Sequence, residues 1–400
     1  MPNDFLEKIN RAISEEEAVE LIKALVKLPS HPPSFGQEKD VAEYIYKVFQ
    51  SEGIESELQL VADERYNIIA RLPGKGNGKK LLLTGHMDTV PVYDMENPYE
   101  AKVEGDKLIG RGTVDMKGPL ACMMLSMIAI KRSGIQLDGD LCFAGVVDEE
   151  EKSLGTIDLI EKGMDFDGAI VGEPTNLDIC VAHRGLEWLE FEIIGKTVHG
   201  GRQSEGINAI LKATDFINLM EERITKELVK RVHPITGTST MNYGTINGGT
   251  QPSTVAGSCN IKIDRRWIPG EKYDDVLNEY REVIEELNKK DPDFACNMKV
   301  LESSVMKKGY THEAMEIDVD CDLVNVIRKA TTEITERVPE KTYFPAWSDG
   351  GLLDTYAKIP TLVFAPGELE SAHSKDEFIS IKQLTPAIKI YALTAYYFCK

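Results

Sequence analysis

The sequence lacks the cysteine patterns of a disulfide-rich or zinc-thiolate protein. Its seven cysteines are scattered along the chain, and no two of them form a C-x-x-C pair. A disulfide framework or a thiolate zinc knuckle normally shows paired spacing. We therefore expect buried, free thiols and a reducing, cytoplasmic environment.

Long hydrophobic runs and positive charge are also scarce. No apolar run approaches the ~20 residues needed to span a bilayer, and the first residues, MPNDFLEKINRAISEEEA, lack the basic and apolar regions of a secretory signal. The chain has 46 Lys and Arg against 66 Asp and Glu, a formal net charge of −20. Nucleic acids and anionic membranes bind basic patches, so we expect neither as a partner.

Motifs for covalent or phosphate chemistry are absent as well. The sequence has no G-x-S-x-G nucleophile elbow. The glycines of PGKGNGKK are wrongly spaced for a phosphate-binding loop, and no Ser or Thr follows the lysine. A covalent nucleophile is therefore not expected.

The pattern of hydrophobic residues predicts two domains, in line with a length of 400 residues. Helical periodicity is found at 15–28, 36–52, 117–131, 206–230, 271–289, 322–335 and 381–398. Strand-like runs are found at 67–72, 80–84, 141–147, 168–171, 186–194, 241–246, 257–264 and 359–364.

The order of these elements changes in the middle of the chain. Strands alternate with helices over residues 1–183 and again over 301–400, which indicates an α/β domain with a mixed, mostly parallel sheet. Residues 184–300 follow a β-α-β-β-α-β order, which is typical of a separate ferredoxin-like α+β domain. We expect this second domain to be inserted into the first.

Unusual polar residues fall where the predicted strands end. His86 and Asp88 end the strand that begins LLLTG, and the acidic run 148–151 follows LCFAGVV. Glu173 follows GAIVG, and His373 comes shortly after IPTLVFAPG. Open α/β sheets bind ligands outside the carboxyl ends of their strands. These side chains are therefore expected to meet at one edge of the sheet.

Such a cluster of carboxylates needs cations, because like charges repel. Asp115, in the glycine-flanked turn GRGTVDMKGP, is a further candidate member. Imidazole and carboxylate ligands without thiolate suit zinc, cobalt or manganese. A bridging carboxylate would hold two such ions roughly 3.5–4 Å apart.

Six stretches, in order, resemble the signature blocks of the aminoacylase-type dinuclear zinc hydrolases. That family includes acetylornithine deacetylase, succinyl-diaminopimelate desuccinylase and glutamate carboxypeptidase. The stretches cover nearly the whole chain: TGHMDTVP, GRGTVDMKGP, VVDEEEKSLGT, VGEPTNL, GKTVHGGRQSEGINAI and PGELESAHSKDE.

The resemblance implies a role for each matching residue. His86 and Glu173 would bind one metal, Glu150 and His373 the other, and Asp115 would bridge both, with a cis peptide after it. Asp88 would accept a hydrogen bond from His86 and fix its tautomer, because residues two apart on a strand share a face. Glu149 would be the general base.

The implied chemistry is amide hydrolysis. A metal lowers the pKa of bound water from ~15.7 toward ~7 and polarises the carbonyl. Glu149 would take the water proton and deliver it to the leaving amine, which requires that it does not itself bind metal.

Further residues match family positions that meet the substrate. His199, in the inserted domain, would stabilise the tetrahedral oxyanion, usually across a dimer interface, although GGRQSEG after it departs from the family's small residues and proline. Arg266 would meet a substrate carboxylate, and Asn247 would also face substrate. Ser348, Asp349 and Gly350 match a loop that cradles the substrate α-carboxylate.

The leading hypothesis is a cytoplasmic amidohydrolase with two divalent metals, zinc by default and cobalt or manganese as alternatives, that deacylates an N-acyl amino acid. A metallo-exopeptidase, either a dipeptidase or a carboxypeptidase, is the first alternative. A non-catalytic metal-binding protein on the same fold is the second. The resemblance also implies a homodimer formed through the inserted lid domain.

Overall fold

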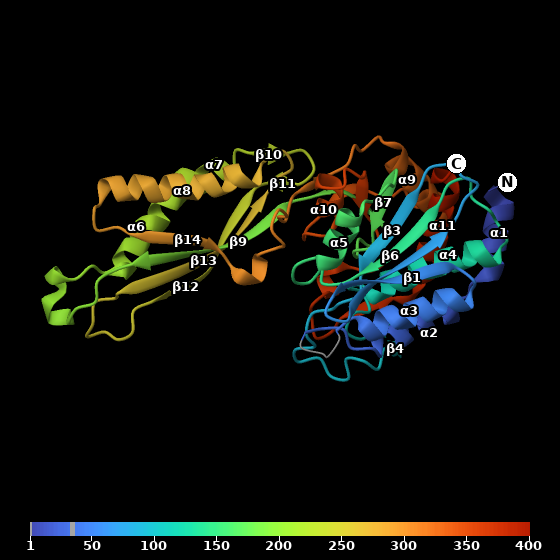
Figure 1. The fold of residues 1–400 in the computed structure, drawn as a ribbon, viewed down its shortest axis with the longest axis horizontal. Helices are drawn as coiled ribbons and strands as arrows, with labels where there is room; N and C mark the ends of the chain where they lie inside the picture. Colours follow the sequence, from blue (N-terminus) through green and yellow to red (C-terminus); the bar gives the residue numbers. More distant parts are fainter. Residues whose placement is uncertain (1, 33–36) are drawn as a thin grey trace. The chain divides into compact units, whose positions relative to one another are not determined.

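The computed structural model describes residues 2–32 and 37–400, and the chain forms two compact units. The first contains the chain up to Ala182 together with Met315–Lys400, and the second is the insertion His183–Ala314 (Figure 1). The sequence pattern placed the end of the insertion near residue 300. It extends further because the amide of Leu186, early in the insertion, donates a hydrogen bond to the carbonyl of His312.

A nine-stranded sheet forms the centre of the first unit. Its strand order is β1-β2-β6-β3-β7-β17-β8-β15, with β16 paired to β8. The four neighbours β6, β3, β7 and β17 run parallel, whereas β1, β2 and β8 pair antiparallel. The predicted α/β fold with a mixed sheet is therefore confirmed, and its parallel pairs lie at the centre of the sheet rather than throughout it. The strands are β1 (Glu55–Ala62), β2 (Arg65–Leu72), β3 (Leu81–His86), β6 (Leu141–Val146), β7 (Gly168–Val171), β8 (Ile179–His183), β15 (Met315–Glu316), β16 (Lys341–Phe344) and β17 (Thr361–Val363).

Helices cover both faces of this sheet, which explains why β3 and β6 are buried along their whole length. On one face, Leu82 and Ala144 join a hydrophobic cluster with residues of α5 and α10. On the other, Phe143 meets Phe49 of α3, with ring centroids 5.3 Å apart. The helices are α1 (Pro2–Ala12), α2 (Glu15–Val26), α3 (Lys39–Ser51), α4 (Lys117–Arg132), α5 (Leu154–Lys162), α9 (Asp322–Thr335), α10 (Gly350–Thr355) and α11 (Ile381–Phe398).

Local signals fix some of these helices. The Ser14 hydroxyl accepts a hydrogen bond from the amide of Glu17 at 3.0 Å and caps α2. Helix α4 is buried on every side from Lys117 to Ile130, as its mostly apolar sequence predicts. A small sheet, β18-β5-β4, lies beside the main one, with β4 (Lys102–Glu104), β5 (Lys107–Ile109), β18 (Phe378–Ser380) and the short η4 (Leu369–Ser371). Among the described residues, none of the helices is long and apolar enough to cross a membrane.

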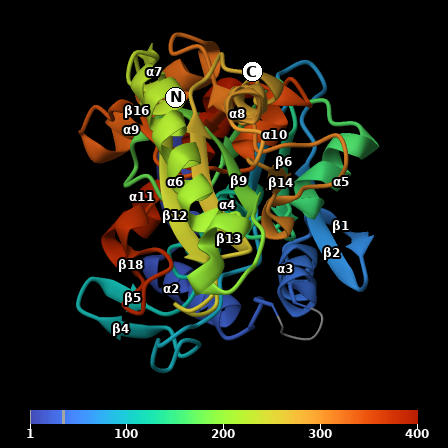
Figure 2. The ribbon, with the colours of Figure 1, turned by 90° about the vertical axis from the view of Figure 1, so that its left-hand side faces the viewer.

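The insertion is built on a four-stranded antiparallel sheet with the order β12-β13-β9-β14. Its first strand along the chain, β9, therefore lies between the third and the fourth, as in a ferredoxin-like fold. Helices α6 and α8 lie on one face of the sheet (Figure 1, Figure 2). The elements are β9 (Gly185–Ile194), η1 (Gly200–Glu205), α6 (Ala209–Met220), the π turn η2 (Glu221–Thr225), α7 (Lys226–Leu228), β10 (Val232–His233), β11 (Gly237–Thr238), β12 (Thr240–Gly248), β13 (Ser258–Trp267), α8 (Tyr273–Lys290), β14 (Cys296–Val300) and η3 (Glu302–Ser304).

The core of the insertion supplies a test of this packing. Phe191 of β9 is fully buried, with its ring 5.0 Å from that of Phe216 and 5.4 Å from that of Tyr280. Phe191→Ala should lower the free energy of unfolding by about 3–5 kcal/mol, because it leaves a cavity between the sheet and both helices.

Trp188 is the matched control, since it lies on the opposite face of β9 and is 37% exposed. Trp188→Ala should cost less than about 1 kcal/mol. Urea unfolding followed by circular dichroism measures both changes. Equal costs for the two substitutions would contradict the assigned core.

Candidate metal centre

The predicted metal ligands come together at one edge of the main sheet. The strands β6, β3, β7 and β17 are adjacent and parallel, so their carboxyl ends share that edge. A ligand follows or ends each strand, and one more precedes α4. These residues are Glu150 after β6, His86 at the end of β3, Glu173 after β7, His373 after β17 and Asp115 before α4.

A continuous chain of contacts joins the five side chains. Glu173 Oε1 lies 3.5 Å from His86 Nε2, and the same nitrogen lies 3.0 Å from Asp115 Oδ1. The other oxygen of Asp115, Oδ2, lies 3.0 Å from His373 Nε2, which in turn lies 3.2 Å from Glu150 Oε1. Asp115 thus presents one oxygen to each imidazole.

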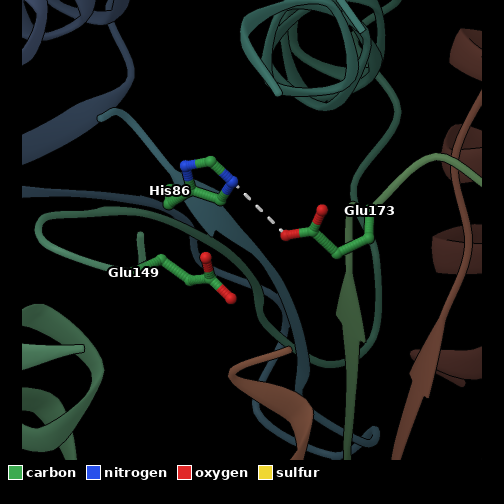
Figure 3. A group of neighbouring side chains, drawn as sticks. All are labelled: His86, Glu149 and Glu173. Carbon is green, nitrogen blue, oxygen red and sulfur yellow. Dashed lines mark ion pairs between the residues drawn. The ribbon is translucent and has the colours of Figure 1, made fainter. Parts of the chain in front are cut away.

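Glu149 points into the same group. Figure 3 shows its carboxylate facing His86 and Glu173. Ligand atoms of these three residues lie within 4.8 Å of one another, and the same holds for His86, Asp115 and Glu150. The peptide bond between Asp115 and Met116 is cis.

Ionisation of the glutamate carboxylates in the cluster is unfavourable in the absence of metal. Burial raises the pKa of Glu149 and of Glu173 well above the usual value, and neighbouring carboxylates raise both further. Burial and the nearby Asp115 also raise the pKa of Glu150. Without a cation, burial and the neighbouring like charges make ionisation of these groups less favourable.

The histidines and Asp115 respond in the opposite sense, because they face partners of the other sign. Burial alone would lower the pKa of His86, but Glu173, Asp115 and Asp88 together raise it well above its usual value. Hydrogen bonds to Asp115 and Glu150 raise the pKa of His373 to about 11. Burial would raise the pKa of Asp115, but the two histidines hold it well below its usual range.

The donor set fits divalent cations. Imidazole nitrogens and carboxylate oxygens are the ligands that zinc, cobalt and manganese share. Glu173 Oε1 is buried and, among the described residues, receives no hydrogen bond within normal geometry. A bound cation stabilises such an arrangement, in which a buried carboxylate oxygen has no hydrogen bond and the neighbouring carboxyl groups have raised pKa values.

Asp88 supports the cluster from behind. Its two carboxylate oxygens accept the backbone amides of Glu149 at 3.2 Å and of Glu150 at 2.9 Å. The nearer partner of His86 Nδ1 is the main-chain carbonyl of Asp88 at 2.9 Å, and the Asp88 carboxylate lies 3.5 Å away. The residue therefore orients His86 chiefly through its backbone and holds the acidic loop through its side chain.

Asp88→Asn tests this support. The amide group of Asn offers one oxygen in place of two, so one of the two backbone amides loses its acceptor. We expect a 10–100-fold loss of metal affinity or of activity. Chelator competition and kcat/KM measure the two quantities. Unchanged values in a folded variant would contradict the role.

The predicted substrate loop 348–350 lies in the first unit and is buried. The Ser348 hydroxyl accepts a hydrogen bond from the amide of Gly350 at 3.3 Å. Asp349 Oδ2 accepts one from Thr156 Oγ1 at 2.6 Å, and burial raises the pKa of Asp349 to about 6. Asp349 also contributes to the raised pKa of Glu149, so its side chain acts on the cluster electrostatically.

The other predicted substrate residues belong to the insertion. His199 is exposed, and its Nδ1 accepts a hydrogen bond from the amide of Gly201 at 3.1 Å. Asn247 is exposed on β12. Arg266 forms a two-pronged ion pair with Asp264 at 2.7 and 3.1 Å. The roles of these three residues stay predictions.

A buried ion pair that was not predicted from the sequence also anchors the acidic loop. Arg65 lies 2.6 Å from Glu38 Oε1 and 2.7 Å from Asp148 Oδ1. Glu38 also accepts the backbone amide of Asp148 at 3.2 Å. Glu38 and Arg65 stand in the charged stretches QEKD and DERYN, which read as surface, so no local signal distinguished them.

A parallel-centred α/β sheet that gathers two histidines and four carboxylates at its edge, interrupted by a ferredoxin-like insertion, defines a metal-dependent hydrolase. The chain belongs to the peptidase family M20/M25/M40, whose family model matches residues 82–397. The protein is therefore an enzyme.

Relatives of known name agree with this assignment. The chain is 29% identical over 407 residues to N-formyl-4-amino-5-aminomethyl-2-methylpyrimidine deformylase of Halalkalibacterium halodurans, covering 96% of this chain and 95% of that one. It is 31% identical over 346 residues to acetylornithine deacetylase of Pectobacterium carotovorum, covering 84% of each. A probable succinyl-diaminopimelate desuccinylase of Staphylococcus aureus is 27% identical, over 94% of this chain and 96% of that one. The resemblance seen in the six motifs is confirmed.

Solved structures confirm the fold. Aminopeptidase PepT of Bacillus cereus superposes with a TM-score of 0.80 at 22% identity, covering 97% of this chain and all of that one. A dinuclear metal-binding peptidase of Bacillus subtilis gives a TM-score of 0.71 at 16% identity, over 96% of this chain and 98% of that one.

Proposed function

We propose that the protein deacylates an N-acyl amino acid by metal-dependent amide hydrolysis. The observation that carries the proposal is the position of Glu149. It faces His86 and Glu173 yet stands outside the chain of contacts that joins the five predicted ligands. A carboxylate so placed is free to accept and return a proton.

The residues divide the work as follows. His86 and Glu173 would hold one cation, Glu150 and His373 the other, and Asp115 would bridge them, with zinc as the default metal and cobalt or manganese as alternatives. Bound cations would polarise the amide carbonyl and lower the pKa of the attacking water. Glu149 would take the proton from that water and deliver it to the leaving nitrogen. Asp88 would keep His86 and the acidic loop in place.

Substrate recognition is proposed from the family resemblance. His199 would stabilise the oxyanion, Arg266 and Asn247 would meet the substrate, and the loop 348–350 would take its carboxylate. The insertion, residues 184–300 in the sequence analysis, would then act as a lid. His199→Ala should lower kcat more than it raises KM if the residue acts on the transition state.

A metallo-exopeptidase is the alternative, because both reactions cleave an amide beside a carboxylate. The named relatives at 26–31% identity include a deformylase, a desuccinylase and a deacetylase. The peptidases are structural neighbours at 22% identity or lower, which shows the fold alone. This difference favours release of an acyl group.

The deciding experiment is a substrate panel on zinc- and cobalt-loaded protein with a chelated control. The panel contains N-formyl, N-acetyl and N-succinyl amino acids, including N-acetylornithine and N-succinyl-diaminopimelate, together with unblocked dipeptides. Metal-dependent release of an acyl group supports the proposal and names the acyl pocket. Cleavage of dipeptides alone would replace it with the exopeptidase.

We also propose that the insertion forms a homodimer. Its edge strand β12 is exposed along most of its length, with Ile246 56% exposed. Ile210 and Leu211 of α6 are exposed as well. Exposed strand edges and grouped apolar residues favour association. Sedimentation equilibrium of the wild-type chain and of Leu211→Glu tests this, and a monomeric wild-type chain would refute it.

A cytoplasmic location is proposed from the cysteines. All seven are free thiols, and five of them are buried. Proteins of oxidising compartments usually use such residues in disulfides. Cell fractionation with an antibody against the chain is the direct test.

A further inference from the structure

Glu377 is a fully buried carboxylate outside the predicted site. Its Oε1 accepts two backbone amides, from Val114 at 3.0 Å and from Asp115 at 3.2 Å. Its Oε2 lies 2.6 Å from Nη1 of Arg111, which is also buried. Both oxygens of one side chain are therefore committed to the segment that ends in the bridging aspartate.

The position of Glu377 along the chain means that these contacts also connect two segments of the metal centre. Glu377 lies shortly after His373 in the sequence and directly precedes β18. Strand β18 pairs with β5, where Phe378 stands opposite Ile109 and the amide of Gly110 donates to the carbonyl of Glu377. The segment that carries His373 is thus fastened to the segment that carries Asp115.

Asp115 and His373, which these two connected segments carry, are in contact at the cluster. Asp115 Oδ2 lies 3.0 Å from His373 Nε2, and Asp115 Oδ1 lies 3.0 Å from His86 Nε2. A rotation or shift of the 114–115 backbone would move both oxygens at once, because they belong to one carboxylate. The precision of the shared ligand therefore depends on what holds its backbone.

We propose that Glu377 is a positioning residue that fixes the bridging carboxylate of Asp115 relative to His373 and so sets the affinity for both metal ions. The inference rests on the metal centre of the proposed function. It assigns to Glu377 two separable contributions, the backbone hydrogen bonds and the ion pair with Arg111. The first of these orients Asp115, and the second offsets the charges of two buried groups.

Paired substitutions separate the two contributions. The double variant Glu377→Gln with Arg111→Met removes both charges but leaves an amide oxygen to accept the backbone amides of Val114 and Asp115. The double variant Glu377→Ala with Arg111→Met removes the charges and the acceptor together. Neither leaves the partner of the Glu377–Arg111 ion pair as an unpaired charge, so both are expected to fold.

Metal affinity of each chain is measured by chelator competition with Zn²⁺ and Co²⁺. The alanine double variant should bind 10–100-fold more weakly than the glutamine double variant, because it alone frees the 114–115 backbone. Hydrogen exchange of the Val114 and Asp115 amides should also be at least about 10-fold faster in the alanine variant, since an unbonded amide opens more easily.

Glu187→Gln is the matched control. Glu187 is a buried carboxylate of the insertion, bonded to Ser304 and Tyr273 and not to the cluster. Its substitution should leave metal affinity and exchange at Val114 and Asp115 unchanged.

The outcomes distinguish this inference from the proposed function. Two metals on the wild-type chain, with a large difference between the double variants, support the inference. Two metals on the wild-type chain with equal affinities and equal exchange in both double variants overturn it, since Glu377 would then serve the fold alone. A wild-type chain that binds no divalent metal overturns the proposed function, and the inference with it.

Discussion

Glu149→Gln should bind the same number of metal ions as the wild-type chain and lose about 10³-fold in kcat. The amide keeps the shape of the side chain but cannot accept a proton from water, and general bases contribute about 10²–10⁴-fold. Because Glu149 stands outside the contacts that join the predicted ligands, its loss should spare metal binding. Metal analysis and steady-state kinetics on the best substrate of the panel measure both quantities.

Glu151 supplies the control within the same acidic run. It is exposed, whereas Glu149 faces the cluster. Glu151→Gln should keep kcat within about twofold, since substitutions of exposed residues that do not face the site have small effects. Full activity of Glu149→Gln would remove the general base from the mechanism. Loss of metal in that variant would instead make Glu149 a ligand.

Removal of the metals should destabilise the protein, and more strongly as the pH rises. Each cation present at 100 times its Kd contributes about 2.7 kcal/mol to the free energy of unfolding. The pH dependence follows from the raised pKa values of Glu149, Glu150 and Glu173 in the metal-free fold. Between the usual pKa of 4.5 and the raised one, the folded state binds more protons than the unfolded state, so stability falls as the pH rises.

The histidines add to the same trend. The pKa of His373 is raised to about 11 and that of His86 is also raised, so their contribution is complete below the usual 6.5 and is lost progressively as the pH rises from 6.5 through the raised values. Asp115, whose pKa is lowered, contributes a constant amount above its usual 3.8. The metal-free chain should therefore lose stability steadily from about pH 5 to about pH 8.

Denaturant unfolding of chelated and metal-loaded protein across this pH range measures the effect. The loaded protein should vary less, because bound cations keep the carboxylates ionised across this pH range. Chelated Glu173→Gln should show a shallower decline than the chelated wild-type chain, because one of the raised groups is gone. A chelated chain whose stability is constant or rises with pH would contradict the assigned electrostatics.

Most ligands of the candidate site could be predicted because they stand at or after the end of an apolar run, whereas Asp115 stands in a glycine-flanked turn. His86 and Glu173 follow segments that only a buried strand explains, and parallel neighbours bring such ends together. The mixed sheet was predictable for the same reason. The register and the order of the strands were not, since periodicity says which residues face the core but not which strand lies beside which.

The residues that support the site could not be predicted from the sequence pattern. Glu377 and Glu38 occur in charged stretches, and their burial arises from pairing with Arg111 and Arg65 far away in the sequence. The predicted helix 206–230 shows another limit. It begins at Ala209, where the Asn208 side chain accepts the amide of Ile210, and it passes through a π turn before it ends at Leu228. Strand β14 is the last strand of the predicted β-α-β-β-α-β order, but its residues could not be located from the sequence because all five are only partly buried or exposed.

The order of the central sheet has a consequence for synthesis of the chain. Strands β7 and β8 are close in sequence but not neighbours in space, because β17 lies between them and pairs with Ala169 on one side and Cys180 on the other. The position between β7 and β8 can therefore be filled only after the whole insertion has been synthesised. Contacts between segments so distant in the sequence form slowly. His373 comes after β17 and is therefore synthesised later still. A ribosome-bound chain that stops before β17 would carry the clustered carboxylates without their second histidine and an unpaired strand edge in the middle of its sheet.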